Sequence, residues 1–249
     1  MCSVSFIPRD DGFVLAMNRD ELISRVPALP PHLHHRGDLA VLCPSEPSGG
    51  TWIGISSAGM AFSLLNWHSQ PDRANDDLIS RGEVVRALLC SHSSSEAASI
   101  LKELPLRRMN PFRLIAVSLP ERSLMEWRSG IEALTSKGHP WKRQHWFSSG
   151  FDEARADQVR RRVCAEFPDL EDLATLRKLH ATHLPTAGPL SLCMHHQDAA
   201  TVSYTEISVR DDTAAMSYIS GSPCSPAARF REVLSLDPSA HSGRVRCLS

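Results

Sequence analysis

The chain opens with MCSVSFIPRDDGFVLAMNRDE (Met1–Glu21), a segment that predicts how its first sheet begins. Two apolar runs flank the pair Asp11-Gly12, a combination typical of a tight β-hairpin. The first strand begins at the chain's second residue, Cys2. The second strand returns to a polar end that holds Arg19 and Asp20. We therefore expect a hairpin whose open end brings these two residues alongside the first strand.

Cys2 carries a nucleophilic thiol at a position that matters. A small second residue favours removal of Met1, which would leave Cys2 with a free α-amino group. An α-amine titrates near ~7.7–8.0, where a general base works well, and it could activate a thiol of ordinary pKa ~8.5. Arg19 could keep that amine neutral, and Asp20 could hold it in place. The alternative is that Cys2 is an ordinary residue of a buried strand.

Length and composition describe an ordinary globular protein. The 249 residues are 42% hydrophobic and 22% charged, enough for one large domain or two small ones with a substantial core. The net charge of −1 gives no general attraction for nucleic acid or membrane. No apolar run approaches a membrane span, and the start does not resemble a signal peptide. We expect a cytoplasmic protein whose partner is a small-molecule substrate or ligand.

The cysteines and histidines do not predict a metal site. The seven cysteines are scattered and form no CxxC pair, which argues against a disulfide framework and a zinc knuckle. They are Cys2, Cys43, Cys90, Cys164, Cys193, Cys224 and Cys247. His32, His34 and His35 follow a proline-rich loop at 26–31 and have no Cys or carboxylate at ligand spacing. We therefore predict no metal and no cofactor.

Apolar runs between turn residues predict further strands. They are expected at residues 39–43, 51–56, 60–65, 112–119, 123–127, 190–194, 201–210 and 214–219. The strand at 60–65 ends at Asn66, whose amide is either a turn residue or a well-placed oxyanion donor. The segment 137–150 is expected to be a loop whose aromatic residues cover the core edge or wall a pocket.

Helical periodicity predicts four helices between these strands. They are expected at residues 80–90, 95–104, 152–167 and 170–180. Ser80 and Glu83 have the spacing of a capping box, and Asp152 is the expected cap of the third helix. Arg155 and residues 160–162 give that helix a basic face, which is usually solvated and otherwise faces an anionic ligand or partner.

A series of motifs stands in a specific order along nearly the whole chain. They are Met1-Cys2, Asn18-Arg19-Asp20-Glu21, Gly49-Gly50-Thr51-Trp52-Ile53-Gly54, Leu64-Leu65-Asn66, Ser80-Arg81-Gly82-Glu83, Pro140-Trp141-Lys142, and Leu192-Cys193-Met194-His195 followed by Thr201, Ser203 and Thr205. In this order they resemble the NRDE family, also called the transport and Golgi organisation 2 (TANGO2-like) family. That family is similar to the N-terminal nucleophile (Ntn) hydrolases of the bile-salt hydrolase and penicillin V acylase group.

The resemblance implies one domain over residues 1–249 with an α+β fold, a four-layer αββα sandwich of two antiparallel sheets flanked by helices. It implies that Cys2 is the nucleophile, Asn66 an oxyanion-hole donor and Arg229 a C-terminal active-site arginine, with Arg19 and Asp20 completing the site. Two positions differ from the hydrolases. Their Arg precedes the Asp by three residues, whereas Arg19 and Asp20 are adjacent, and Ser136 stands where they carry a second Asn.

The resemblance leaves three functions open. The first is an Ntn cysteine amidohydrolase that acts on a non-peptide C–N amide bond of a small acyl-amide. The second is a haem-, lipid- or acyl-CoA-binding and trafficking protein, in which Cys2 is structural or a haem ligand. His195, His196 or the histidines at 32, 34 and 35 could assist. Haem would be a cofactor under this alternative alone. The third is a scaffold that keeps the fold without a ligand.

Overall fold

The hairpin predicted from the first stretch is confirmed in the computed structural model, which describes residues 2–74 and 77–237. Strand β1 (Cys2–Arg9) pairs antiparallel with β2 (Gly12–Leu22), and Cys2 lies opposite Arg19. The turn needs Gly12, because a Cβ there would lie 2.3 Å from the carbonyl oxygen of Val209 on a neighbouring strand. This close approach fixes how the hairpin joins the rest of its sheet.

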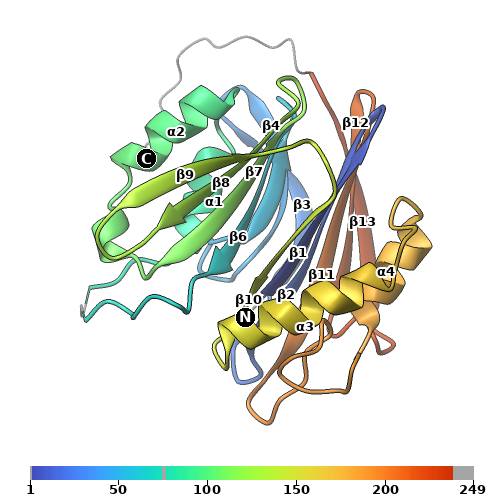
Figure 1. Cartoon of the computed structure of the whole chain (residues 1–249). Helices are drawn as coiled ribbons and strands as arrows, with labels where there is room; N and C mark the ends of the chain where they lie inside the picture. Colours follow the sequence, from blue (N-terminus) through green and yellow to red (C-terminus); the bar gives the residue numbers. More distant parts are fainter. Residues whose placement is uncertain (1, 75–76, 238–249) are drawn as a thin grey trace.

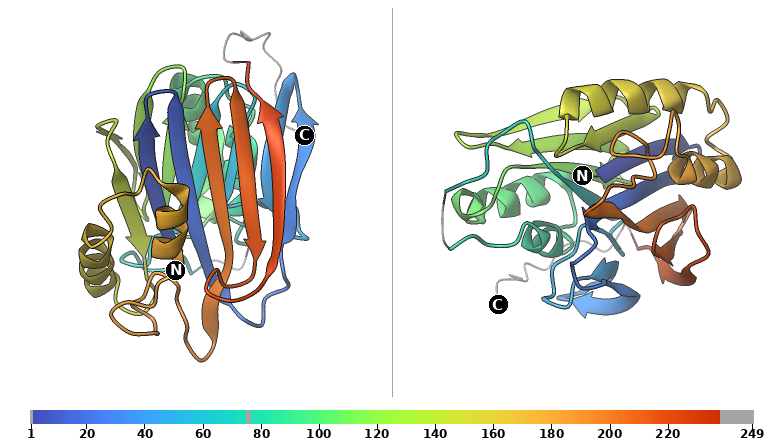
Figure 2. Two further views of the ribbon diagram at one scale, coloured as in Figure 1. Left: turned by 90° about the vertical axis from the view of Figure 1, so that its right-hand side faces the viewer. Right: turned by 90° about the horizontal axis from the view of Figure 1, so that it is seen from below.

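The hairpin lies inside a six-stranded antiparallel sheet with the order β10-β1-β2-β11-β12-β13. The other strands of this sheet are β10 (Gln144–Ser148), β11 (Ala199–Arg210), β12 (Thr213–Ser220) and β13 (Ala228–Ser235). A strand from the middle of the chain (β10) and one from its last quarter (β11) therefore flank the N-terminal hairpin, and Figure 2 shows the orange β11 beside the blue hairpin. The start of β1 is enclosed between β2 and β10.

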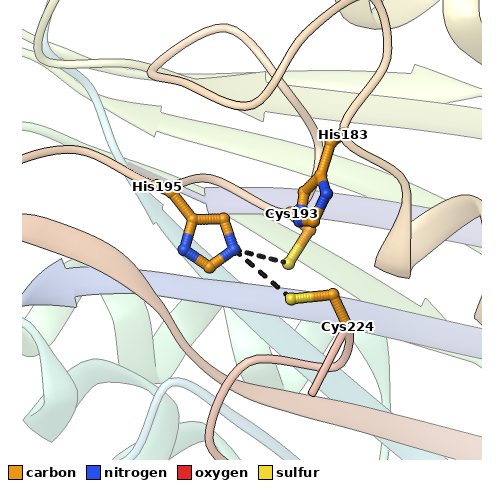
Figure 3. A group of neighbouring side chains, drawn as sticks. All are labelled: His183, Cys193, His195 and Cys224. Carbon is orange, nitrogen blue, oxygen red and sulfur yellow. Dashed lines mark hydrogen bonds between the residues drawn. The ribbon is translucent and has the colours of Figure 1, made fainter.

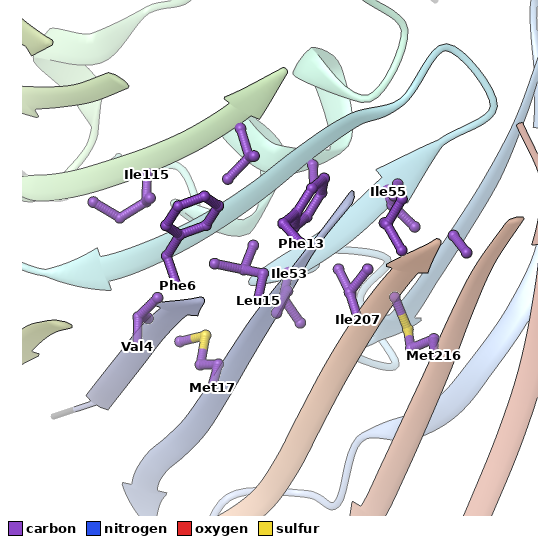
Figure 4. Close-up of a cluster of buried hydrophobic side chains, with 14 of the residues drawn as sticks. Val4, Phe6, Phe13, Leu15, Met17, Ile53, Ile55, Ile115, Ile207 and Met216 are labelled. Carbon is purple, nitrogen blue, oxygen red and sulfur yellow. The ribbon is translucent and has the colours of Figure 1, made fainter. Parts of the chain in front are cut away.

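The second sheet has seven antiparallel strands in sequence order. They are β3 (Leu29–Arg36), β4 (Leu39–Ser45), β5 (Ile53–Ser56), β6 (Met60–Asn66), β7 (Phe112–Ser118), β8 (Ser123–Ser129) and β9 (Leu134–His139). The two sheets pack face to face (Figure 1). The central core between them includes Val4, Phe6 and Leu15 from the first sheet and Ile53 and Ile115 from the second (Figure 4). Burying each such side chain contributes about 1.5–3 kcal/mol.

Helices cover the outer face of each sheet. Helices α1 (Gly82–Leu88) and α2 (Ser94–Glu103) pack on the second sheet, followed by the short helix η1 (Leu106–Arg108). Helices α3 (Glu153–Ala165) and α4 (Leu173–Ala181) pack on the first sheet. The predicted αββα sandwich is thus confirmed. Among the described residues, no helix combines the length and the apolarity needed to cross a membrane.

Several local predictions were wrong. The histidines expected after a loop lie on strand β3, and the expected loop at 137–150 contains the end of β9 and all of β10. Prolines are tolerated in β3 because it is an edge strand. The strand expected at 190–194 is absent, whereas β13 was not predicted. Ser80 does not form the capping box, since α1 begins after Arg81 without a side-chain cap.

Candidate active site around Cys2

A cavity of about 400 Å³ lies at the open end of the first hairpin, and Cys2 forms part of its wall. Strands of both sheets and the segment just before α1 enclose it. Its lining is mainly polar and includes Arg19, Asp20, Asn66 and Arg81. Four of the five predicted site residues therefore line the same cavity: Cys2, Arg19, Asp20 and Asn66.

Strand alternation divides the motif Asn18–Glu21 between two sides of the sheet. Arg19 lies on the same side as its cross-strand partner Cys2. Its guanidinium carbon is 4.4 Å from the ring centre of Trp52, and Nη2 is 2.6 Å from Glu46 Oε1 and 3.3 Å from Glu21 Oε2. Arg19 is thus held as a cation beside Cys2 by one aromatic ring and two carboxylates.

Asp20 contacts the neighbouring strand β11 and helix α3, which covers the outer face of the first sheet. Its Oδ1 accepts a 2.6 Å hydrogen bond from the Thr201 hydroxyl, and its Oδ2 lies 3.7 Å from Nη2 of Arg160. The side chains of Asp20 and Arg160 are both fully buried. Burial raises the pKa of Asp20, and the charge of Arg160 opposes this rise. The adjacency of Arg19 and Asp20 therefore gives each residue a separate environment.

Arg160 is a site residue that the sequence analysis placed on a solvated face. It is buried instead, and its Nη1 donates to the carbonyl oxygen of Cys2 at 3.4 Å and to Ser3 Oγ at 3.2 Å. One guanidinium thereby links the backbone of Cys2 to the carboxylate of Asp20. The spacing of Arg160 from the buried residues Ala156, Val163 and Cys164 is the signal that could have identified it.

The Cys2 thiol is buried beside these charges. Burial raises its pKa, and this effect outweighs the opposing hydrogen bond from the Asp20 backbone and the charge of Arg19. The thiol is therefore protonated at neutral pH and needs a base before it can attack. The described residues that line the cavity include no histidine that could serve as that base. Met1 lies outside the described residues.

Asn66 and Arg81 complete the cavity wall from the second sheet. Asn66 is the last residue of β6, is half-buried, and pairs with Phe112 through its backbone. Arg81 precedes α1, donates to the carbonyl oxygen of Pro111 at 3.2 Å, and interacts electrostatically with Cys2. Burial lowers the pKa of Arg81. Arg81 belongs to a motif of the family resemblance, but no role was predicted for it.

A close backbone contact holds the segment of Arg81 against the cavity. A Cβ on Gly82 would lie 2.9 Å from the Cα of Gly50, so neither position leaves room for a side chain. The backbone N–H of Thr51 donates to the carbonyl oxygen of Gly82 at 3.2 Å. Both glycines belong to motifs of the resemblance, and their contact is a structural reason for them.

Two other residues lie away from Cys2. Arg229 is exposed on β13, and strands β12, β11 and β2 separate it from β1. Ser136 is exposed on β9, the last strand of the other sheet. The serine beside Cys2 is Ser148, its direct partner on β10. Its buried Oγ has no hydrogen-bond partner among the described residues.

Comparison with solved structures shows which proteins share this fold. Penicillin V acylase from Agrobacterium tumefaciens matches with a TM-score of 0.52 at 12% sequence identity, over 93% of this chain and 85% of that protein. A mutant of conjugated bile acid hydrolase from Clostridium perfringens matches with a TM-score of 0.52 at 11% identity, over 94% and 92% of the two chains. At these identities the likeness shows the fold, and it confirms the predicted Ntn-hydrolase-like sandwich.

Sequence comparisons identify the family. A search of curated proteins gives no significant match. The model of the family described as Transport and Golgi organisation 2 matches residues 1–182, which is more than half of the chain and includes the cavity residues named above. The predicted family is therefore confirmed, and the chain belongs to the Transport and Golgi organisation 2 family.

Proposed function

We propose that this protein is an N-terminal cysteine amidohydrolase that cleaves a non-peptide C–N amide bond of a small acyl-amide. The observation that carries the proposal is the placement of Cys2, which lines a cavity together with Arg19, its cross-strand partner, and Asn66. Two proteins that share the fold are named as an acylase and a hydrolase. The proposal requires removal of Met1, so that Cys2 carries the α-amine.

The α-amine is the base that this site needs. The described lining offers carboxylates and arginines but no histidine, and the Asp20 carboxylate is engaged by Thr201 and Arg160 on the other side of the sheet. An α-amine of pKa ~7.7–8.0 is partly neutral at physiological pH and can accept the thiol proton. Arg160 donates to the carbonyl oxygen of Cys2 and lies 3.7 Å from Asp20, and on this proposal these contacts would hold the amine near Asp20.

The reaction then follows the usual course of acyl transfer to a thiol. The amine takes the Cys2 proton, and the sulfur attacks the substrate carbonyl carbon to give a tetrahedral oxyanion. Asn66 donates a hydrogen bond to this oxyanion, and such a donor typically contributes about 3 kcal/mol. The C–N bond breaks as the ammonium returns its proton to the leaving amine. Water then hydrolyses the thioester and regenerates the thiol.

Arg81 favours a substrate that carries an anionic group. Arg81 lines the cavity just before α1, and a negative charge on Cys2 raises the pKa of its guanidinium. Arg19 is already neutralised by Glu21 and Glu46. We therefore assign the anion to Arg81 and the tuning of Cys2 to Arg19. The role predicted for the exposed Arg229 stays a prediction.

Ligand binding without catalysis is the second candidate, and family membership is compatible with it. Haem and acyl chains bury large apolar surfaces, whereas this cavity is lined largely by charged and polar groups. A small polar or anionic acyl-amide fits that lining better. The mechanism requires no cofactor, and we propose a cytoplasmic location, where the cysteines stay reduced.

A panel of small acyl-amides tests the proposal, with penicillin V and short-chain N-acyl amino acids, which carry a carboxylate, as its members. Turnover is followed by release of the amine, and the thioester on Cys2 is sought by intact mass after acid quenching. Cys2→Ala should abolish both signals. Cys90→Ala, which removes a buried thiol outside the cavity, is the matched control. Equal turnover by Cys2→Ala and wild type would end the proposal.

A further inference from the structure

A second group of reactive side chains lies outside the cavity. His183 follows α4, Cys193 and His195 lie in the segment before β11, and Cys224 lies in the connection between β12 and β13. The potential ligand atoms of all four side chains lie within 4.8 Å of one another. Figure 3 shows the two sulfur atoms facing the His195 ring, with His183 beside Cys193. The fold thus brings together cysteines whose scattered spacing predicted no metal site.

We propose that His183, Cys193, His195 and Cys224 bind one Zn²⁺ ion in a tetrahedral site. Bonds of about 2.3 Å to sulfur and about 2.0–2.1 Å to nitrogen place neighbouring tetrahedral ligands roughly 3.3–3.8 Å apart. Nε2 of His195 lies 3.3 Å from the Cys224 sulfur and 3.6 Å from the Cys193 sulfur. Both distances have the length of an edge of such a tetrahedron.

The fourth ligand supplies an independent observation. Nε2 of His183 is buried and has no hydrogen-bond partner among the described residues. A buried ring nitrogen without a partner loses its hydration without compensation. The rings of His183 and His195 meet edge to face, with centroids 5.0 Å apart, so they do not stack on one another. A metal bond would satisfy this nitrogen.

The donor set selects the ion. Two thiolates and two neutral imidazoles form a set that suits zinc, whereas magnesium and calcium prefer oxygen ligands. Four protein ligands fill a tetrahedral site, which is the arrangement of structural rather than catalytic zinc. Binding would release the two thiol protons, and the two thiolate charges would balance the ion.

The ion would connect the part of the chain that supports Asp20. It would tie the end of α4, the segment at 193–195 and the β12–β13 connection to one point. Within this segment the backbone N–H of Met194 donates to the Thr201 hydroxyl at 2.8 Å, and that hydroxyl donates to Asp20 at 2.6 Å. The zinc ion would therefore stabilise the segment that supports Asp20. This proposal does not depend on whether the protein is a hydrolase.

Metal binding by the full chain tests the proposal. Protein purified under reducing conditions without chelator should contain about one zinc per chain, measured by elemental analysis. The apo-protein should bind one equivalent of Co²⁺ with the intense visible bands of tetrahedral thiolate coordination, and Zn²⁺ should displace it. His183→Ala and Cys224→Ser should weaken Co²⁺ binding by at least about 10²-fold, since even outer-shell partners of metal ligands contribute ~10–100-fold. Cys90→Ser should bind like the wild type.

Three results would overturn the zinc site. One is reduced apo-protein that gives no tetrahedral Co²⁺ spectrum. Another is Co²⁺ binding that His183→Ala and Cys224→Ser leave unchanged. A third is a Cys193–Cys224 disulfide that persists in protein prepared with zinc and reductant. All three measurements use the wild type or folded variants, and none depends on catalytic activity.

Discussion

The two groups of cysteines differ in what surrounds the sulfur. Cys2 lines a cavity that contains arginines and carboxylates, whereas the sulfur atoms of Cys193 and Cys224 lie 3.6 and 3.3 Å from the same nitrogen, Nε2 of His195. The groups are close enough that the charge of Asp20 acts on both Cys2 and Cys193. We infer that the environment of Cys2 suits reaction with a substrate, whereas the environment of Cys193 and Cys224 suits coordination of a metal ion.

Alkylation separates the two groups most sharply. With zinc present, iodoacetamide should label Cys2, because Cys2 lines the cavity and the proposed α-amine can take up its thiol proton. It should spare Cys193 and Cys224, because metal-bound thiolates are shielded. A chelator should make Cys224 label readily, since this side chain is exposed. Peptide mass mapping with and without chelator measures this. Labelling of Cys224 that is equally fast with zinc and with chelator would contradict the difference.

Arg160→Met tests whether the charges behind Cys2 depend on one another. The variant leaves the buried carboxylate of Asp20 without its cation, and breaking a buried pair in this way costs about 3–5 kcal/mol. Urea unfolding should show this loss. Arg161→Met removes an exposed arginine from the same helix and is the matched control, with an expected loss within about 0.5 kcal/mol. Equal stability of the two variants would mean that Asp20 does not need Arg160.

Asn66→Ala tests the cavity side of the comparison. Loss of an oxyanion donor should lower kcat about 10²–10³-fold with little change in KM. Steady-state kinetics on a substrate from the acyl-amide panel measures both constants. Asn110→Ala, which removes another amide from the cavity wall, is the control. A large rise in KM at constant kcat would instead assign Asn66 to substrate binding.

Acid should act on a third group of buried side chains behind β1. Ser5 Oγ lies 2.9 Å from Nδ1 of His145 and 2.9 Å from Nε2 of His180. Burial lowers the pKa of His145 to about 4 and that of His180 to about 3. Both histidines are therefore neutral in the folded protein. The unfolded chain, with an ordinary histidine pKa of ~6.5, takes up the protons first.

Stability from these histidines is complete above about pH 6.5 and is lost as the pH falls through 6.5 toward the folded pKa values. His145 alone should remove about 2 kcal/mol between pH 7.5 and pH 5. His145→Gln should therefore lose about 2 kcal/mol less than the wild type over this range, measured by urea unfolding at both pH values. Identical pH dependence in the two proteins would mean that His145 has the same pKa in the folded and unfolded chains, so that burial does not lower it.

The sequence predicted the parts of the fold that depend on local pattern. The first hairpin, the strand that ends at Asn66 and the cap at Asp152 follow from turn residues, apolar periodicity and side-chain capping. Strand β3 was missed because prolines argue against a strand except at an edge, and edge position is a property of the whole sheet. Strand β13 also lies at the edge of a sheet, a position that local sequence pattern does not reveal.

The candidate site was predictable where strand pairing decides it. Arg19 opposite Cys2 follows from the hairpin register, and family motifs identified Asn66. Arg160 and Arg81 were not assigned to the site, because arginines on a helix or before one are usually solvated. The group of His183, Cys193, His195 and Cys224 joins three segments whose proximity depends on the folded sheet. The spacing of these residues in the sequence does not predict that they lie together.

The most direct test of the central claim is the intact mass of protein expressed with its natural first residues and any tag at the C-terminus. We predict a mass that lacks one methionine. Loss of Met1 leaves Cys2 with the free α-amine that the mechanism requires. A mass that retains Met1 would contradict the N-terminal nucleophile, because Cys2 would then have no amine to accept its proton.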